Sequence, residues 1–152
     1  MIRTRFIGDY EQLANNTPVD TLASTPETAL ASLITLDQFP RNMFRGTARM
    51  FGSDPKALHL AHEVHAKGLD QQVEPARRLF CYLPFEHSET LADQDLSVAL
   101  FEQLGDPLYV RYAKEHRDIV ARFGRFPHRN AVLDRPSTSE EVAFLAQPGS
   151  SF

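Results

Sequence analysis

The side chains best suited to binding an anion are concentrated in one cationic segment, residues 111–130. Extended to Arg135, this segment carries seven Lys or Arg residues against three Asp or Glu residues, whereas the whole chain has a net charge of −4. It also contains His116 and His128. Guanidinium forks bind carboxylate and phosphate groups through two parallel hydrogen bonds. The composition of the segment therefore indicates a local site for one phosphate or carboxylate.

Three ionisable residues fall on apolar helix faces, where the helical period of 100° per residue turns them towards the interior. Asp37 and Asp93 lie within stripes of Ala and Leu residues, and His116 lies in the middle of a stripe of aromatic and aliphatic residues. A buried carboxylate is costly without a partner, so each acid needs a cation or several hydrogen-bond donors. We expect these partners from the cationic segment and from Arg41 and Arg45.

Two interpretations of this cluster are open from the sequence. In the first, the residues form a buried ion-pair network that only fixes how the helices and the loop 124–137 dock. In the second, they support a cleft for a small anionic metabolite, and a catalytic version would need a carboxylate or histidine with a perturbed pKa beside the ligand. No catalytic residue is assigned. The candidate ligand-binding residues are Asp37, Arg41, Asn42, Arg45, His87, Asp93, His116, Arg125, His128, Arg129 and Asn130.

Other residues that could do chemistry have simpler structural roles. His59, His62 and His65 recur every three residues, but the apolar stripe of their helix puts the first two on the solvent side. Their spacing also differs from the i, i+4 histidine pair of zinc peptidases. Cys81 fits a core position, and Ser88 is better placed as a helix cap than as a nucleophile. No glycine-rich phosphate loop occurs. We expect no metal ion and no cofactor.

Length and composition are those of one globular domain over residues 1–152. The apolar fraction is 42%, the charged fraction 24% and the isoelectric point about 5.8, which argues against binding to nucleic acid or to an anionic membrane. The single cysteine excludes an intrachain disulfide, and no apolar run reaches the roughly 18 residues of a membrane span. The start has no apolar block typical of a signal peptide. We expect a cytoplasmic protein.

Helix signals recur along the chain with Pro or Gly punctuation, and no stretch alternates with a period of two. Pro40 and Pro84 are expected to end or interrupt helices, and Gly68, Gly105 and Gly124 to close them. The sequence predicts an all-α fold of about six or seven antiparallel helices. Expected helices cover residues 2–13, 26–39, 54–68, 75–82, 89–104 and 107–123, and a short last helix follows a capping box of Thr138 and Glu141.

Two Phe-Pro elbows present similar donors. Residues 39–42 read FPRN and residues 126–130 read FPHRN, so each Pro is followed closely by Arg and Asn. A proline that ends a helix would hold these donors in a fixed place. Two similar helix ends explain the match, and two such short segments do not establish a duplicated ancestor.

Four long segments resemble a bacterial family of uncharacterised helical proteins, known as a domain of unknown function and grouped with tetratricopeptide-like folds. They are residues 36–58 (LDQFPRNMFRGTARMFGSDPKAL), 82–104 (YLPFEHSETLADQDLSVALFEQL), 116–133 (HRDIVARFGRFPHRNAVL) and 137–145 (STSEEVAFL). The resemblance implies an all-helical, tetratricopeptide-like architecture and no established activity.

This chain departs from the family pattern at two places. Asp134 stands where the family usually has Gly, which affects the local loop conformation. Family members usually carry an extra leading segment with tryptophans, whereas this chain has no Trp. A shortened start would expose apolar surface that a second subunit could cover, so a homodimer is also an expectation.

The resemblance adds a rival function, an interaction module whose helical groove receives a peptide. The two functions differ in where their polar groups meet. A closed pocket lined by Arg41, Arg125, Arg129, His87 and His116 favours a small anionic ligand. An open concave groove with scattered side chains favours a peptide.

Overall fold

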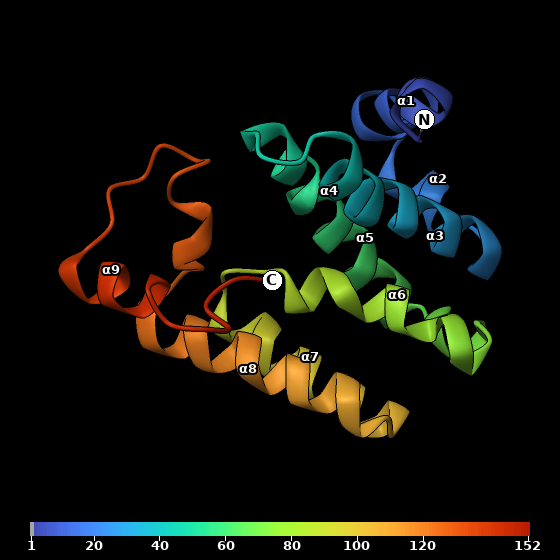
Figure 1. Ribbon diagram of the computed structural model, residues 1–152. Helices are drawn as coiled ribbons and strands as arrows, with labels where there is room; N and C mark the ends of the chain where they lie inside the picture. Colours follow the sequence, from blue (N-terminus) through green and yellow to red (C-terminus); the bar gives the residue numbers. More distant parts are fainter. Residues whose placement is uncertain (1) are drawn as a thin grey trace.

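Helices follow one another along the whole described chain, and no β-strand occurs among residues 2–152, which the computed structural model describes. The prediction of an all-α fold is confirmed (Figure 1). The α-helices are α1 (Ile2–Asn15), α2 (Val19–Leu22), α3 (Pro26–Leu33), α4 (Phe39–Met43), α5 (Asp54–Ala66), α6 (Pro75–Glu86), α7 (Leu91–Leu104), α8 (Pro107–Phe123) and α9 (Ser139–Leu145). A π-helical turn, η1 (Ile34–Gln38), and the 3₁₀ turns η2 (Ala48–Phe51), η3 (Asp70–Gln72) and η4 (Pro127–Arg129) complete the chain.

The main core is built where consecutive helices pack on each other. Helix α6 packs between α5 and α7, α8 packs on α7, and α3 lies against both α5 and α6. Large buried side chains such as Leu36, Leu60, Phe85 and Phe101 fill the space between them. Burial of this apolar surface drives the packing. The sequential arrangement is compatible with the tetratricopeptide-like architecture that the family resemblance implies.

Pro40 does not end its helix, which corrects the sequence prediction. The chain continues from α3 through the π-helical turn η1 into α4, so Pro40 lies inside one helical run. A proline leaves the carbonyl four residues earlier without its usual donor. That carbonyl belongs to Leu36, and the Ser53 hydroxyl donates to it at 2.6 Å. The side chain of Ser53 thus replaces the missing backbone donor, and the wider π turn accommodates the ring.

Pro84 likewise lies inside a helix, because α6 extends past it to Glu86. The prediction that this helix runs only to Tyr82 was wrong. Ser88 also differs from its expected role. The N-cap of α7 is Thr90, without a side-chain cap bond, and the Ser88 hydroxyl donates instead to Asp93 at 2.7 Å.

Several boundaries lie where the sequence predicts them. Helix α8 starts at Asp106, whose side chain accepts from the Leu108 amide, and it ends at Gly124 in the left-handed conformation. Thr138 and Glu141 form the predicted capping box of α9. Asp134 is also left-handed, with φ of 54°. A residue with a Cβ is strained in this conformation, and glycine is not.

The segment after α8 is held against the end of α6 by one acid. The Glu89 carboxylate accepts two hydrogen bonds from Arg135, at 2.7 and 2.9 Å, and a third from the Phe126 amide at 2.8 Å. Bidentate Arg–carboxylate contacts of this kind fix geometry well. Figure 1 shows this segment and α9 at one end of the molecule, away from α1. Glu89 therefore positions the turn η4, which carries His128 and Arg129.

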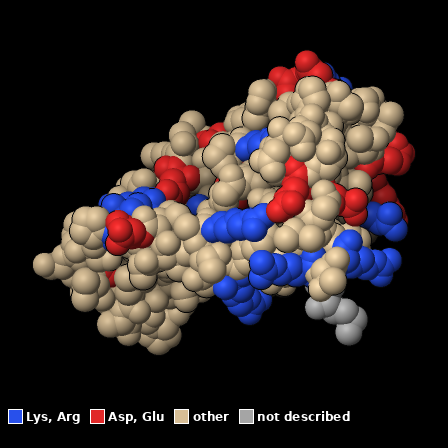
Figure 2. All heavy atoms as spheres, turned by 90° about the horizontal axis from the view of Figure 1, so that it is seen from above, with Lys and Arg blue, Asp and Glu red and all other residues tan. Residues whose placement is uncertain are grey.

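Acidic and basic side chains are interspersed over the face shown in Figure 2. Among residues 2–152, no helix has both the length and the apolar character needed to span a membrane.

Candidate functional site

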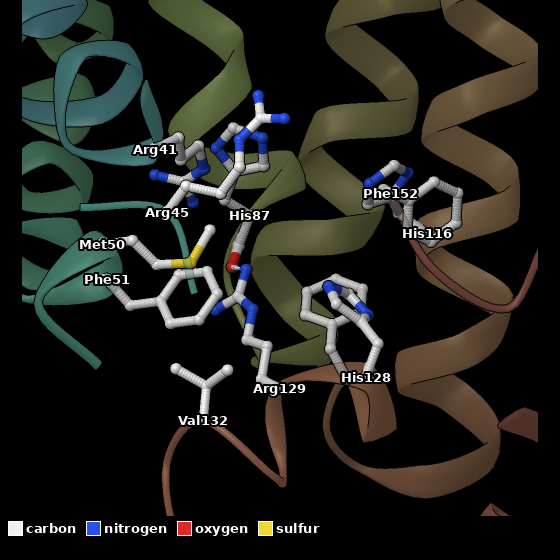
Figure 3. Close-up of a pocket in the computed structure, with 11 residues that line it drawn as sticks. Arg41, Arg45, Met50, Phe51, His87, His116, His128, Arg129, Val132 and Phe152 are labelled. Carbon is white, nitrogen blue, oxygen red and sulfur yellow. Dashed lines mark hydrogen bonds between the residues drawn. The ribbon is translucent and has the colours of Figure 1, made fainter. Parts of the chain in front are cut away.

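A cavity of about 480 Å³ lies where the end of α6, η2, α8 and η4 meet (Figure 3). These elements come from all parts of the chain, so the cavity exists only in the folded protein. Arginine and histidine side chains form one part of its wall, and apolar side chains form the rest. The lining residues are Arg41, Arg45, Met50, Phe51, His87, His116, Phe126, His128, Arg129, Val132 and Phe152.

Arg129 is the buried cation at the centre of the cavity wall, with 7% of its surface exposed. Its guanidinium lies between the rings of Phe51 and Phe126, at 4.5 and 4.7 Å from their centroids. One terminal nitrogen donates to the His87 carbonyl at 2.8 Å, and the other lies 3.6 Å from an Asp54 oxygen. Its Nε has no hydrogen-bond partner among residues 2–152. Burial lowers the pKa of Arg129, and the neighbouring cation Arg41 lowers it further against the opposing effect of Asp54.

Arg41 is much better compensated than Arg129. Its two terminal nitrogens donate to the Asp54 carboxylate at 2.8 and 3.0 Å, and one of them also donates to the Asp37 carbonyl. The same nitrogen lies 3.4 Å from the Asp37 carboxylate. Two acids, Asp37 and Asp54, contact Arg41 and Arg129, and the third arginine of the wall, Arg45, is exposed and forms no ion pair with either acid. These five side chains carry one excess positive charge, and Arg129 is the buried arginine with the weaker acid contact.

His87 is oriented by a buried carboxylate. Its Nδ1 lies 2.7 Å from an oxygen of Asp37, which is only 2% exposed. Burial alone would raise the pKa of Asp37, but the imidazole of His87 and the guanidinium of Arg41 outweigh it and lower the pKa. Asp37 is thus a carboxylate, which can only accept hydrogen bonds. The hydrogen of the His87 ring consequently lies on Nδ1.

The imidazoles of His116 and His128, which also line the wall, are neutral. Burial lowers the pKa of His116 to about 3, and burial together with Arg129 lowers that of His128 to about 4. His116 donates from Nδ1 to the Tyr112 carbonyl at 2.8 Å and stacks on the ring of Phe152. Nδ1 of His128 is buried without a partner among the described residues. Neutral imidazoles offer an acceptor nitrogen to a ligand, so the excess of positive charge comes from arginine.

Glu86 lies behind His116, with the nearest oxygen 3.6 Å from Nδ1 of that ring. Burial, and then the negative charge of Asp37, raises the pKa of Glu86 to about 8. At neutral pH this contact therefore joins a protonated acid to a neutral imidazole and is no ion pair. Within the described part of the chain, no three His, Cys, Asp or Glu side chains form a group that could hold a metal ion.

A second cavity of about 330 Å³ borders the first, and both are lined by Phe51, His87 and Arg129. Its wall also contains Asp37, Asp54 and Glu89, together with apolar residues of α5 and α6. The ring of Phe51 and the guanidinium of Arg129 border both spaces. A ligand in the first cavity would therefore contact Arg129, which also lines the second, more acidic cavity.

Most of the residues expected at the cleft are brought together by the fold, and four are not. Asn42 is exposed and donates to the Gln38 carbonyl. Asp93 is buried as predicted, but its partners are His62 at 2.9 Å and Ser88 rather than an arginine. Arg125 and Asn130 contact Glu141, where they hold α9. The residues that line the first cavity are Arg41, Arg45, His87, His116, His128 and Arg129, and Asp37 lines the second.

Sequence reasoning missed the acid and the aromatic rings that complete the site. The Asp54-Pro55 pair is a common signal for a helix start, so the sequence gives Asp54 a local role and no partner. Phe51 lies between two helices predicted from the sequence, where no helical period marks it as buried. Phe126 could have been found, since it is the first residue of the second Phe-Pro elbow. The residues missed are Met50, Phe51, Asp54, Glu86, Phe126, Val132 and Phe152.

Comparisons with known proteins place this chain among bacterial proteins without an assigned activity. The family model described as a bacterial protein of unknown function, DUF924, matches residues 1–149. The chain is also similar to the solved structure of a protein of unknown function, ATU0120 from Agrobacterium tumefaciens, with 46% identity and a TM-score of 0.89. The match covers 95% of this chain and 81% of that one. No curated protein matches the chain.

Proposed function

This chain belongs to DUF924, a bacterial protein family of unknown function, and we propose that it binds a small organic monoanion in the cavity around Arg129. The observation that carries the proposal is the state of this arginine. It is buried, its Nε lacks a partner among the described residues, and its nearest acid is 3.6 Å away. A buried charge that is poorly compensated is costly unless a ligand completes its hydrogen bonds.

The charge of the wall favours a ligand with one negative charge. Three arginines, Arg41, Arg45 and Arg129, line the cavity. The two acids that contact Arg41 and Arg129 are Asp37 and Asp54, so these five side chains together carry a single positive charge. A monocarboxylate would balance this charge. A phosphate monoester with two charges would overcompensate it and would approach Asp54.

The rest of the wall favours a ligand with an apolar body. Met50, Phe51, Phe126, Val132 and Phe152 supply side chains that cannot form hydrogen bonds with a polar ligand. A volume of about 480 Å³ lies in the usual range for small-molecule sites, and such sites combine apolar walls with a few polar groups that orient the ligand. The ligand class is therefore an amphipathic monocarboxylate.

The alternative is a tetratricopeptide-like interaction module that receives a peptide, with the polar cluster serving only as structure. Convergence of Arg41, Arg129, His87 and His116 on one cavity supports the small ligand. A peptide groove would instead spread its contacts along several helices.

A thermal-shift panel of mono- and dicarboxylates, 2-oxo acids and phosphates tests the proposal. An amphipathic monocarboxylate at a hundred times its dissociation constant should stabilise the protein by about 2.7 kcal/mol. Arg129→Met keeps an apolar stem between the two rings and removes the guanidinium, so this variant should fold and lose the stabilisation. Arg117→Met is the matched control, because the Arg117 side chain is 40% exposed and contacts Asp95 outside the cavity. The proposal is wrong if no monocarboxylate stabilises the wild-type protein, or if Arg129→Met responds as the wild type does.

A further inference from the structure

Among residues 2–152, three buried aspartates each contact an imidazole and form a pair with it. One is the pair of His62 and Asp93, which lies outside the cavities and whose imidazole is 48% exposed. Another is buried Asp70, which accepts from Tyr82 and contacts His65. The third is the pair of Asp37 and His87, which borders both cavities. Of these three pairs, the third lines the two cavities described above.

The geometry points to His87 as a general base, which removes a proton from a carbon next to the carbonyl group of a 2-oxo monocarboxylate held by Arg129. This inference rests on the proposed anion site and adds a reaction to it. Asp37 is a positioning residue, because it would contact the imidazole and not the substrate.

The first support is the tautomer of His87. The Asp37 carboxylate occupies Nδ1 at 2.7 Å, so the ring hydrogen lies there. None of the hydrogen bonds among residues 2–152 uses Nε2 of His87. A histidine that a buried carboxylate orients in this way offers the lone pair of Nε2 to whatever lies in the cavity, as general bases do in enzymes.

The second support is the direct connection between the base and the anion-binding residue. Arg129 donates to the backbone carbonyl of His87 at 2.8 Å, so the guanidinium and the imidazole are fixed to one residue. Figure 3 shows Arg129 reaching from η4 towards this carbonyl oxygen, with His87 on the same side of the cavity. A carboxylate bound to Arg129 would therefore bring the neighbouring carbons of the ligand near His87. Such fixed positioning supplies much of the advantage of a catalytic base.

The third support is the absence of a nucleophile from the wall. Neither Ser, Thr, Cys nor Lys is among the residues that line the first cavity. Ser88 lines the second, but its hydroxyl donates to Asp93 at 2.7 Å. A base in this wall therefore acts on the ligand or on water rather than on a protein nucleophile, and the acidic groups that a 2-oxo acid offers are the C–H bonds next to its carbonyl group.

The step is balanced without a co-reactant. The C–H proton at C3 of the 2-oxo acid moves to Nε2 of His87, and the electron pair of that bond forms a C–C double bond. The electrons of the carbonyl π bond move to its oxygen, which gives an enolate beside the cationic wall. Return of a proton from the imidazolium to C3 restores the 2-oxo acid. In D₂O the returned nucleus is deuterium, so turnover appears as exchange at C3.

Phenylpyruvate and 4-methyl-2-oxopentanoate are suitable probes, since both are monoanions with an apolar body. Their exchange at C3 is followed by proton NMR in D₂O, and their binding is measured separately by calorimetry. His87→Asn can still donate to Asp37 but has no Nε2, so exchange should fall about 100-fold or more while binding persists. His62→Asn, in the other Asp–His pair, should leave exchange unchanged.

The protonation of His87 can be measured without a substrate. Nitrogen-15 NMR of the imidazoles should show His87 protonated on Nδ1 and free at Nε2, and Asp37→Asn should weaken this preference and slow the exchange. If a probe binds and its exchange at C3 is equally fast in the wild type and in His87→Asn, then His87 is not the general base. The proposed anion site would be unaffected by that result. Protonation of His87 on Nε2 would overturn the general base as well. If neither probe nor any other monocarboxylate binds, the proposed function itself fails.

Discussion

Glu86→Gln should stabilise this protein at neutral pH. Glu86 is 5% exposed, and burial and then the Asp37 carboxylate raise its pKa to about 8 from an ordinary 4.5. The folded state therefore holds this proton more tightly than the unfolded chain. The stability that the protonated carboxyl provides is fully present below pH 4.5 and is lost as the pH rises towards 8.

The magnitude follows from the two pKa values. At pH 7 the carboxyl is ionised in the unfolded chain and mostly protonated in the folded protein. At roughly 1.4 kcal/mol per pH unit above 4.5, this difference costs the folded state about 3 kcal/mol. Glutamine has a similar shape and no proton to lose. The variant should gain about 3 kcal/mol at pH 7 and less than about 1 kcal/mol at pH 5.

His116 makes the free energy of unfolding change with pH in the direction opposite to Glu86, so the wild type does not show the effect of Glu86 by itself. Burial lowers its pKa to about 3, so its contribution to stability is present above pH 6.5 and is lost as the pH falls. By pH 5 the loss from His116 is about 2 kcal/mol, and His128, whose pKa burial lowers to about 4, adds a further loss in the same direction. Together these losses exceed the gain from Glu86, so the wild type should be less stable at pH 5 than at pH 7, and Glu86→Gln should lose still more stability over this range.

Urea unfolding at pH 5, 6, 7 and 8 measures these differences. Glu102→Gln is the matched control, because Glu102 is about half exposed and contacts Lys114 at the surface. A variant no more stable than the wild type at pH 7 would refute the reasoning. So would a carbon-13 NMR titration of the Glu86 carboxyl with a midpoint near 4.5.

Two further variants test how the fold is held together. Lys56→Met should lower the free energy of unfolding by about 2 kcal/mol, because the Lys56 ammonium donates to the carbonyls of Leu13, Ala14 and Thr17 at the end of α1; an unchanged urea midpoint would contradict this. Asp134→Gly should raise the free energy of unfolding by about 0.5 to 1 kcal/mol, since glycine adopts the positive φ of this position without strain. A lower melting temperature for Asp134→Gly would show that the Asp134 side chain stabilises the loop.

The sequence was sufficient for those features that depend on local pattern. Periodicity and capping residues predicted an all-α fold, the start and end of α8, and the capping box of α9. The same periodicity placed Asp37, Asp93 and His116 in the interior, and all three are buried. Local pattern succeeds here because a helix repeats every 3.6 residues, so the sequence alone tells which side chains share a face.

Only the tertiary structure decided which buried groups meet. Asp37 contacts His87, 50 positions along the chain, whereas Asp93 contacts His62 and no arginine. Pro40 continues its helix because Ser53, from a different segment, donates to the carbonyl that the proline leaves free. Helical phase fixes the direction of a side chain and says nothing about the element it faces. Partners, cavities and the stacking of Arg129 between two rings arise only when helices distant in sequence pack together.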